Sequence, residues 1–418
     1  MVKKIHYHSD CAFFAGCENM LVNFWSSAEL RRQFEVSFSY RDSERYTAGL
    51  EQRAQPNFPV YPLCFPDLTD PAIFPEQCPL LAKRALLLGM RLALTLPLLW
   101  YEAWTLRGLF AHLRPDVVHI NCGGYPAALS ARAAVFAARL ARVPAVVMVV
   151  NNQAVDYSRP SRWLSYPMDR LIARLVSRFV TGSLSAAIQL KKVLRLNQEK
   201  CHALHNGIAL REVTETGEET RKRLGLDKFD GVLFGVVAIL RPNKGHQVLL
   251  DAIAKLAAAG AQHLAPPIKI LIEGDGPLRD ELQEFVANNH LSEQCIFVGE
   301  EENVMNFMAL LDVLILPSVD HEDFPNVILE AMGLGKPVIA SRLAGTPEQL
   351  VDRETGILVT PREADQLAAA INRLSLDERL RLSMGQAGRR RFQTLFTAEV
   401  AVENYLSLYR SLIGSQIK

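Results

Sequence analysis

Short apolar runs alternate with helical patterns along the whole chain. Five apolar runs in the first half predict strands at residues 5–7, 36–38, 117–120, 146–150 and 179–181. Helical patterns lie between most of these runs, for example at 127–140. The second half repeats the scheme, with strands predicted at 233–237, 268–272, 296–298, 313–316, 338–340 and 357–359. Strands that alternate with helices form parallel, doubly wound sheets. The pattern therefore predicts an α/β fold with two Rossmann-like domains facing each other across a cleft.

The length of 418 residues is more than one ordinary core needs, and it suits two domains. We expect an N-terminal domain at 1–205, a C-terminal domain at 206–395 and a final segment at 396–418. The polar stretch 214–220 is expected to belong to the linker between the domains. Thr397 can cap a last helix that runs to about residue 413.

The composition is that of an ordinary globular protein, with 49% hydrophobic and 22% charged residues. A net charge of +1 gives no reason to expect nucleic acid as a partner. The seven cysteines form no CxxC pair, which favours free thiols in a reducing cytosol. The N-terminus has no apolar signal core. We therefore expect a cytoplasmic protein.

Residues 80–110 are rich in leucine and need separate treatment. The uncharged stretch runs only from 92 to 101 and includes Pro97, which is too short to span a bilayer. One interpretation is a buried or interface helix that is broken near Pro97. The other is an interfacial surface on the inner face of the cell membrane, because basic residues flank the leucines and two tryptophans follow. The residues behind this second interpretation are Lys83, Arg84, Arg91, Trp100 and Trp104.

The stretch 318–340 carries the strongest functional signal. A buried strand at 313–316 ends in a loop that opens a helix, and such a helix start exposes backbone N–H groups that attract phosphate. Glu322 precedes the helix and Glu330 lies about two turns inside it, so they can hold two hydroxyl-bearing parts of one ligand. A sugar nucleotide has that layout. Taken singly, each glutamate is more simply a solvated surface residue.

The whole string closely resembles the donor-binding motif of the retaining glycosyltransferases of family four, which have the GT-B fold and are also described as glycosyl transferases group 1. The resemblance implies that Glu322 contacts the donor sugar and Glu330 the ribose. It also implies that the backbone around Phe324, Pro325 and Asn326 faces the diphosphate. A final helix that crosses back to the N-terminal domain is likewise implied only by the resemblance.

A second match follows the strand at 233–237. Lys244 falls where the family has its phosphate-binding lysine, and a lysine or arginine after a strand can neutralise a diphosphate. The family arginine most often falls at the position of Ile239. We expect Arg241 to replace it, because residues two apart on a strand share a face if strand character persists.

Several glycines follow strands in the same way. Gly16 matches the family glycine that faces the diphosphate, although Ala15 stands where a first glycine is usual. Gly274 and Gly276 allow a tight turn against a base or ribose, and a turn without ligand contact is an equal alternative. The Asn206-Gly207 pair is interpreted as a turn and not as catalytic.

The main departure from the family pattern follows the strand at 146–150. Many relatives carry a histidine there that points at the donor sugar, whereas this chain has Asn151-Asn152. Asparagine can hydrogen bond to a hydroxyl but does not titrate near neutral pH. Arg159, Arg162 and Arg170 follow, and they are either solvated or able to hold a phosphate on the acceptor.

The resemblance implies a glycosyltransferase that moves a sugar from a nucleotide diphosphate donor, most simply UDP-linked, to a hydroxyl acceptor with retention of configuration. The acceptor is expected to be a glycan or a lipid-linked molecule of surface polysaccharide or lipopolysaccharide assembly. We expect no cofactor and no metal, because no Asp-x-Asp motif occurs in a matching place. A non-hydrolysing sugar-nucleotide epimerase and a non-enzymatic sugar-binding module remain as alternatives.

Overall fold

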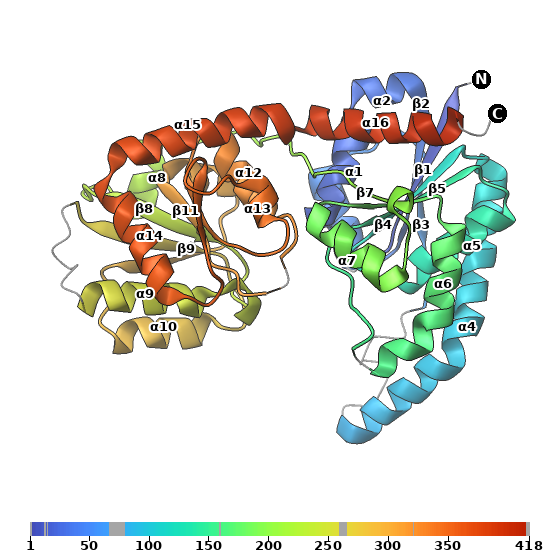
Figure 1. Cartoon of the computed structure of the whole chain (residues 1–418), viewed down its shortest axis with the longest axis horizontal. Helices are drawn as coiled ribbons and strands as arrows, with labels where there is room; N and C mark the ends of the chain where they lie inside the picture. The colour runs from blue at the N-terminus through green and yellow to red at the C-terminus, as the bar shows by residue number, and fades with distance from the viewer. Residues whose placement is uncertain are drawn as a thin grey trace. The chain divides into compact units, whose positions relative to one another are not determined.

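The computed structural model describes residues 2–11, 14, 16–66, 80–158, 160–258, 266–320 and 322–414. Among these, it leaves out the side chains of residues 17, 80–88, 90–92, 160 and 161. By their internal contacts, the residues form two compact units. The first contains the chain up to Leu204 together with the part from Val402 onward, and the second runs from His205 to Ala401 (Figure 1).

The described part of the first unit is built on a seven-stranded sheet with the order β3-β2-β1-β4-β5-β6-β7. All neighbouring strands pair in parallel. The strands are β1 (Lys3–Ser9), β2 (Phe34–Arg41), β3 (Val60–Leu63), β4 (Val117–Cys122), β5 (Ala145–Val150), β6 (Arg178–Thr181) and β7 (Cys201–Ala203). Every residue of β4 and β5 is buried, as expected for a parallel sheet that is covered on both faces.

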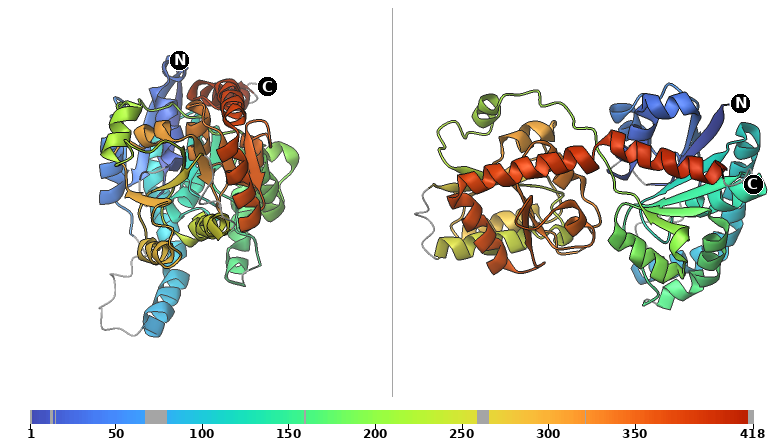
Figure 2. Two further views of the ribbon diagram at one scale, coloured as in Figure 1. Left: turned by 90° about the vertical axis from the view of Figure 1, so that its left-hand side faces the viewer. Right: turned by 45° about the horizontal axis from the view of Figure 1, so that its top comes forward.

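Helices cover both faces of this sheet (Figure 2). They are α1 (Gly16–Ser26), α2 (Ala28–Gln33), α3 (Glu44–Arg53), α4 (Leu80–Leu113), α5 (Leu129–Leu140), α6 (Tyr166–Leu175), α7 (Leu184–Leu194) and the greater part of α16 (Ala398–Gly414), with short 3₁₀ turns at Pro160–Ser165 and Gln198–Lys200. Thr397 accepts a hydrogen bond from the Val400 N–H, so α16 begins where the sequence predicts. Within the first unit, Tyr409 of this helix lies 2.7 Å from Nδ1 of His119 on β4.

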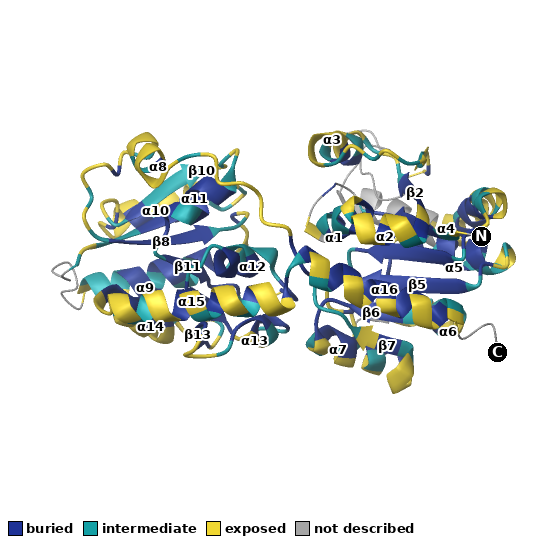
Figure 3. Cartoon of the chain, turned by 90° about the horizontal axis from the view of Figure 1, so that it is seen from above, coloured by how far each residue is buried: buried dark blue, intermediate teal, exposed yellow. Residues whose placement is uncertain are grey.

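The described residues of the second unit form a six-stranded parallel sheet with the order β10-β9-β8-β11-β12-β13. Its strands are β8 (Val232–Val237), β9 (Ile268–Glu273), β10 (Cys295–Gly299), β11 (Val313–Leu316), β12 (Val338–Ser341) and β13 (Gly356–Val359). Its helices are α8 (Gly217–Arg223), α9 (His246–Ala258), α10 (Arg279–Asn288), α11 (Val304–Leu310), α12 (Asn326–Gly333), α13 (Thr346–Gln349), α14 (Ala364–Leu376) and α15 (Glu378–Leu395), with a 3₁₀ turn at Pro242–Lys244. The sheet is buried between helices whose outer faces are exposed (Figure 3).

The α/β class and the two Rossmann-like domains are therefore confirmed. All six strands predicted for the second half are present. In the first half, β3 and β7 were not predicted from the sequence. Both are short strands at the two edges of the sheet, and β3 contains Pro62, which weakens the strand signal.

The interpretation of 214–220 as part of the linker is wrong. These residues lie within the second unit, and from Gly217 onward they form α8. The polar composition has a local cause, because Thr216 and Glu219 form a capping box in which each side chain bonds the other residue's backbone N–H. The polar stretch therefore marks the start of a helix.

The break that was expected near Pro97 is also absent, because α4 is one continuous helix that contains this proline. A proline removes one backbone hydrogen bond, but leucine and alanine on either side favour the helix. The helix is also held from outside, since Leu99, Ala103 and Leu106 are buried in the core of the first unit.

Candidate active site

The candidate donor site lies at the carboxyl ends of the central strands of the sheet in the second unit. Strands β8 and β11 are neighbours in this sheet, although they are its first and fourth strands along the chain. The strand order therefore reverses between them, and ligands of doubly wound sheets bind beside such a reversal, at the carboxyl ends of the strands. Lys244 lies in the loop after β8 and Glu322 in the loop after β11, so both predicted residues lie on loops that follow the two strands where the order reverses.

A glycine brings the loops after β8 and β11 together. Gly245 has a φ of +73°, and a Cβ at this position would lie 2.0 Å from the carbonyl oxygen of Pro317. The Val319 N–H also donates to the carbonyl of Asn243 at 2.9 Å. The backbone at position 245 therefore requires a residue without a side chain. The close approach of the two loops places Lys244 beside the loop that carries Glu322.

Lys244 and Glu322 form an ion pair, which the sequence analysis did not foresee. The Lys244 ammonium donates to Oε1 of Glu322, and the Ser318 hydroxyl donates to the same oxygen at 3.0 Å. The Glu322 side chain is 9% exposed and that of Lys244 is 25% exposed. Burial of the carboxylate is tolerated because it has a cation and a hydroxyl as partners. The pair thus fixes one positive and one negative group at the strand reversal.

Residues 324–326 lead into α12. Phe324 is buried, Pro325 is the N-cap residue and Asn326 is the first helical residue. Proline supplies no side-chain cap, so the first turn depends on other acceptors for its backbone N–H groups. The arrangement is a helix start that can receive an anion next to the Lys244 ammonium.

Glu330 lies on α12, and its surroundings include two residues that the sequence analysis did not single out. Its Oε1 is 3.7 Å from a guanidinium nitrogen of Arg211. Burial raises the pKa of Glu330, and Arg211 partly opposes this change. Burial likewise raises the pKa of Glu273, at the end of β9, to about 7, although a hydrogen bond from the Glu301 N–H works against it. Arg211 lies in a loop, where no sequence pattern indicated it.

Arg241 does not lie on a strand. Strand β8 ends at Val237, and the Arg241 N–H bonds back to the carbonyl of Ile239 at 2.8 Å in a tight turn. The condition that would place Arg241 and Ile239 on one strand face is therefore not met. Arg241 and Ile239 are both exposed, and Arg241 as part of a phosphate clamp stays a prediction.

Gly274 and Gly276 make close contacts with the loop after β8. Their φ angles are +119° and +158°, and a Cβ would lie 2.2 Å from the Ala238 carbonyl oxygen in one case and 2.6 Å from that of Leu240 in the other. The Leu240 N–H also donates to the Asp275 carbonyl at 2.9 Å. These glycines thus hold two strand-end loops together. Their contact with a donor stays a prediction.

We expect Gly274→Ala to destabilise the protein by about 2–4 kcal/mol, because the new Cβ strains the backbone and collides with a carbonyl. Urea unfolding of the second unit measures the effect. Gly217→Ala is the matched control, since nothing lies within 4 Å of a Cβ at that helical position. Equal stability of the two variants would show that the loops after β8 and β9 can move apart to accept a Cβ at little cost in stability.

In the first unit, Gly16 is exposed at the start of α1. Glu18 is buried two residues later and accepts hydrogen bonds from Ser9 Oγ at 3.1 Å and Asn121 Nδ2 at 3.3 Å. Glu18 therefore connects the ends of β1 and β4. A contact between Gly16 and the donor stays a prediction.

The amides of Asn151 and Asn152 are used within the protein. The Asn151 amide donates to Asn121 Oδ1 and to the Cys122 carbonyl, both at 2.8 Å. The Asn152 amide donates to the Gly123 carbonyl at 2.6 Å. Where many relatives are expected to have a histidine, this chain thus has two amides that fix the loop after β4.

The interpretation of the nearby arginines as solvated is wrong for Arg162. This residue is buried and pairs with Asp169 at 3.0 Å. Asp169 also accepts from the hydroxyls of Tyr125 at 3.1 Å and Tyr157 at 2.6 Å. Arg170 donates to the carbonyl of Leu194, and Arg159 lies outside the described residues.

A second charged cluster in the first unit was missed. Glu102 of α4 is buried, and its Oε2 has no hydrogen-bond partner among the residues that the structure describes. Burial, reinforced by Asp10, raises the pKa of Glu102 to about 8, while Arg41 and Arg132 oppose the rise. The signal was hidden because Glu102 lies in a segment that stands out for its leucines and tryptophans. In the described part of the chain, no group of three or more His, Cys, Asp or Glu side chains could hold a metal ion.

Two family models match the chain. Residues 218–391 match the model described as glycosyl transferases group 1, and residues 30–207 match the glycosyl transferase 4-like domain. Together the two matched ranges take in most of both units.

Curated relatives and solved structures agree with these matches. The chain is 29% identical to N-acetyl-alpha-D-glucosaminyl L-malate synthase of Bacillus anthracis over 47% of this chain and 49% of the relative. It is 30% identical to the lipopolysaccharide core biosynthesis glycosyltransferase LpsE of Rhizobium meliloti over 40% and 46%. The chain thus spans about half the length of these curated relatives.

The crystal structure of Anabaena HepE in complex with UDP has a TM-score of 0.72 and 20% identity to this chain. The likeness covers 98% of this chain and all of that one. At this identity the likeness shows the fold, which is of the GT-B type. The chain therefore belongs to the glycosyl transferases group 1 family, with a glycosyl transferase 4-like domain in its first half.

Proposed function

We propose that this chain transfers a sugar from a nucleoside diphosphate sugar to a hydroxyl acceptor with retention of configuration. The observation that carries the proposal is the Lys244–Glu322 pair at the strand reversal of the second unit, beside the uncapped start of α12. One positive group and several N–H groups gather there, next to a carboxylate, and Glu330 lies about one turn farther along the same helix. This combination suits a ligand with two phosphates between two hydroxyl-bearing parts.

Each group would have a distinct task in this reaction. The leaving diphosphate gains negative charge as the bond to the sugar breaks. The Lys244 ammonium and the first N–H groups of α12 would stabilise that charge, and such preorganised donors are usually the largest catalytic term. Glu322 would hold Lys244 in place and contact the donor sugar. We propose that this charge stabilisation needs no metal ion and that attack occurs on the face that the phosphate leaves.

We expect Glu330→Ala to weaken binding of the nucleoside diphosphate by about 1.5–3 kcal/mol, since a charged acceptor for ribose hydroxyls is lost. Titration calorimetry with UDP measures this change. Glu284→Ala is a matched control, because Glu284 is an exposed glutamate on helix α10 of the same unit. An unchanged UDP affinity in Glu330→Ala would refute the ribose assignment.

UDP is the first nucleotide to test, because Anabaena HepE, which shares the fold, was solved with UDP. The relative LpsE is named for lipopolysaccharide core biosynthesis. We extend that class to this chain as a proposal, with a glycan or a lipid-linked molecule of surface polysaccharide assembly as the acceptor. We expect the acceptor to bind in the first unit.

A release assay tests the proposed reaction. The protein is incubated with UDP-, GDP- and ADP-sugars and a mixture of glycan and glycolipid acceptors, and free nucleoside diphosphate is measured. We expect one nucleotide sugar to yield its diphosphate only when acceptors are present. A nucleotide sugar that stays intact but changes its sugar configuration would instead reveal an epimerase. Binding without any turnover would favour a sugar-binding module.

The first unit also carries an exposed apolar face on α4. Leu96, Trp100, Tyr101 and Trp104 are each more than half exposed, whereas Leu99 and Ala103 of the same helix are buried. The guanidinium of Arg107 lies 4.6 Å from the Trp104 ring centroid. No helix in the described part of the chain has the length and apolar character that a membrane span requires. Tryptophans beside basic residues suit a helix that lies in a lipid interface, so we propose peripheral contact with the cytoplasmic face of the membrane.

We expect the wild-type protein to co-sediment with vesicles rich in phosphatidylglycerol at low salt and less with phosphatidylcholine vesicles. A Trp100→Ser/Trp104→Ser variant should lose most of this binding.

Replacing Lys83, Arg84 and Arg91 with glutamine should abolish the lipid preference, since each basic residue near an anionic surface contributes about 1 kcal/mol. The side chains of these three residues lie outside the described residues. Leu382→Ser alters an equally exposed residue of the second unit and serves as the control. Wild-type protein that ignores anionic vesicles would contradict the proposal.

A further inference from the structure

Three aromatic rings join the proposed donor loop, which spans Glu322 to Asn326, to His205, the first residue of the second unit. The His205 ring stacks on the Phe324 ring with centroids 5.0 Å apart and an interplanar angle of 11°. Phe396 packs edge-on against both rings, with its centroid 5.7 Å from each. Phe324 lies two residues after Glu322, whereas His205 and Phe396 are far from it in sequence. The Phe324 side chain is thus held by residues outside its own loop.

The second contact of His205 reaches helix α13. Its Nε2 lies 3.0 Å from Oε2 of Glu348, so an N–H at this position donates to the carboxylate. The neighbouring Gln349 amide donates to the Pro325 carbonyl at 3.0 Å. The Gly345 N–H donates to the Asp323 carbonyl at 2.9 Å. The donor loop is therefore bonded to α13 on both sides of Phe324, and His205 contacts the loop and the helix together.

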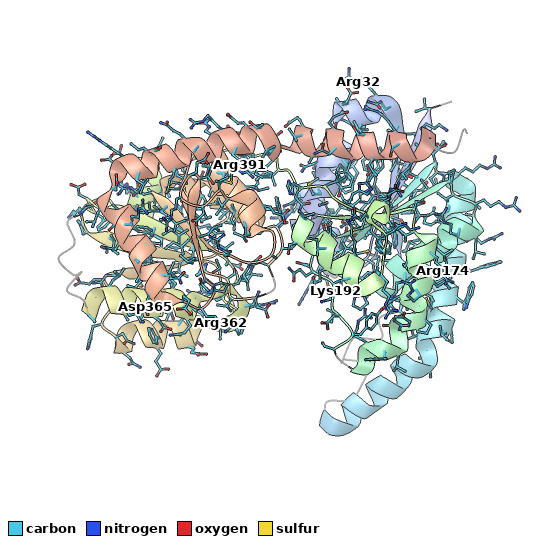
Figure 4. The ribbon with its side chains drawn as sticks, viewed as in Figure 1. Arg32, Arg174, Lys192, Arg362, Asp365 and Arg391 are labelled. Carbon is cyan, nitrogen blue, oxygen red and sulfur yellow. The ribbon has the colours of Figure 1, made fainter. Side chains whose placement is uncertain are left out.

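Arg391 of α15, which is labelled in Figure 4, fixes the rest of this cluster. Its guanidinium donates to the carbonyls of Glu348 and Gln349, both at 2.8 Å. It also lies 5.5 Å from the Phe396 ring centroid. The ring cluster and α13 are thus tied to a long helix of the same unit.

The segments on either side of the cluster are hydrogen-bonded to each other. The Ile208 N–H donates to the Phe396 carbonyl at 3.0 Å, and the Ala398 N–H donates to the Ile208 carbonyl at 3.1 Å. A Cβ at Gly207 would lie 2.1 Å from the Thr397 carbonyl oxygen. His205 consequently projects from a fixed backbone and can hold the Phe324 ring in one place.

We infer that His205 is a positioning residue for the donor diphosphate. It acts through Phe324: the stacked imidazole holds that ring, and the ring sets the backbone from Glu322 to Asn326 that faces the diphosphate. The inference rests on the proposed function, because it takes this loop as the donor site. Glu348 keeps the imidazole in the plane that the stack requires. Loss of the ring should therefore weaken diphosphate binding, although the assignment gives His205 no contact with the donor.

Titration calorimetry of the whole chain with UDP and with UMP tests the inference. His205→Ala should raise the dissociation constant of UDP about five- to tenfold, as expected when a stacked pair is lost. The affinity for UMP should change much less, because the loop faces the diphosphate. His205→Phe keeps a ring for the stack and should restore UDP binding to within about twofold of the wild type. If His205→Ala does not fold, His205→Leu fills a similar volume without a planar ring and replaces it.

The controls separate this inference from the proposed function. His202→Ala changes an exposed histidine on β7 and should leave UDP binding unchanged. If the wild type binds UDP and His205→Ala binds it equally well, the inference is wrong, but the proposed donor site is not contradicted. Equal losses in His205→Ala and His205→Phe would also overturn it, because the ring would then not carry the effect. A wild-type protein that binds neither UDP, GDP nor ADP would overturn the proposed function itself.

Discussion

Replacing Glu322 by alanine is expected to lower the rate of sugar transfer about 100- to 1,000-fold, the range typical of losing one preorganised catalytic group. The nearly buried carboxylate accepts hydrogen bonds from Lys244 and Ser318. Its removal takes away the proposed contact with the donor sugar and the carboxylate that holds the Lys244 ammonium in position. UDP should still bind, because the freed Lys244 can pair with the diphosphate. The measurements are initial rates of diphosphate release and calorimetry with UDP.

Glu363→Ala, which changes an exposed glutamate at the start of α14, is the matched control for Glu322→Ala and should retain full activity. An equal loss of UDP binding and transfer in Glu322→Ala would contradict a role at the sugar. It would indicate instead that Glu322 serves only to build the loop.

The second large effect is expected from Lys244→Ala. This change removes the cation that pairs with Glu322, so turnover should fall about 100-fold or more. Binding of UMP should fall much less than binding of UDP, since the proposed target is the diphosphate. The comparison requires kcat from the release assay and the two dissociation constants.

Arg241→Ala belongs in the same series as Lys244→Ala, because it decides whether a second cation takes part. An activity within about twofold of the wild type would mean that the proposed clamp is a single lysine. Unchanged turnover in Lys244→Ala would contradict the assignment of Lys244 to the leaving group.

The fold could be predicted where the chemistry is local and repeated. Strands such as β5 and β11 are buried on both faces, so each is an uninterrupted apolar run. Edge strands lack that signal, and β3 with Pro62 was missed for this reason. The polar run before α8 was misread because a capping box and a linker have similar compositions.

The site could be predicted only in part because its residues meet through folding. The spacing of Glu322 and Glu330 and the position of Lys244 are visible in the sequence. The ion pair between Lys244 and Glu322 is not, since it depends on Gly245 fitting against Pro317. The stack of His205 on Phe324 joins residues more than 100 positions apart, so no local pattern could indicate it. Glu102 was hidden by the apolar residues around it.

A crystal structure of the chain with UDP would show whether Lys244 and the start of α12 bind the donor diphosphate. We expect diphosphate oxygens at hydrogen-bonding distance, about 3 Å, from Lys244 Nζ and from backbone N–H groups at the start of α12. We also expect ribose hydroxyls at that distance from the Glu330 carboxylate. UDP bound elsewhere, or with its phosphates away from Lys244 and α12, would refute the proposed donor site.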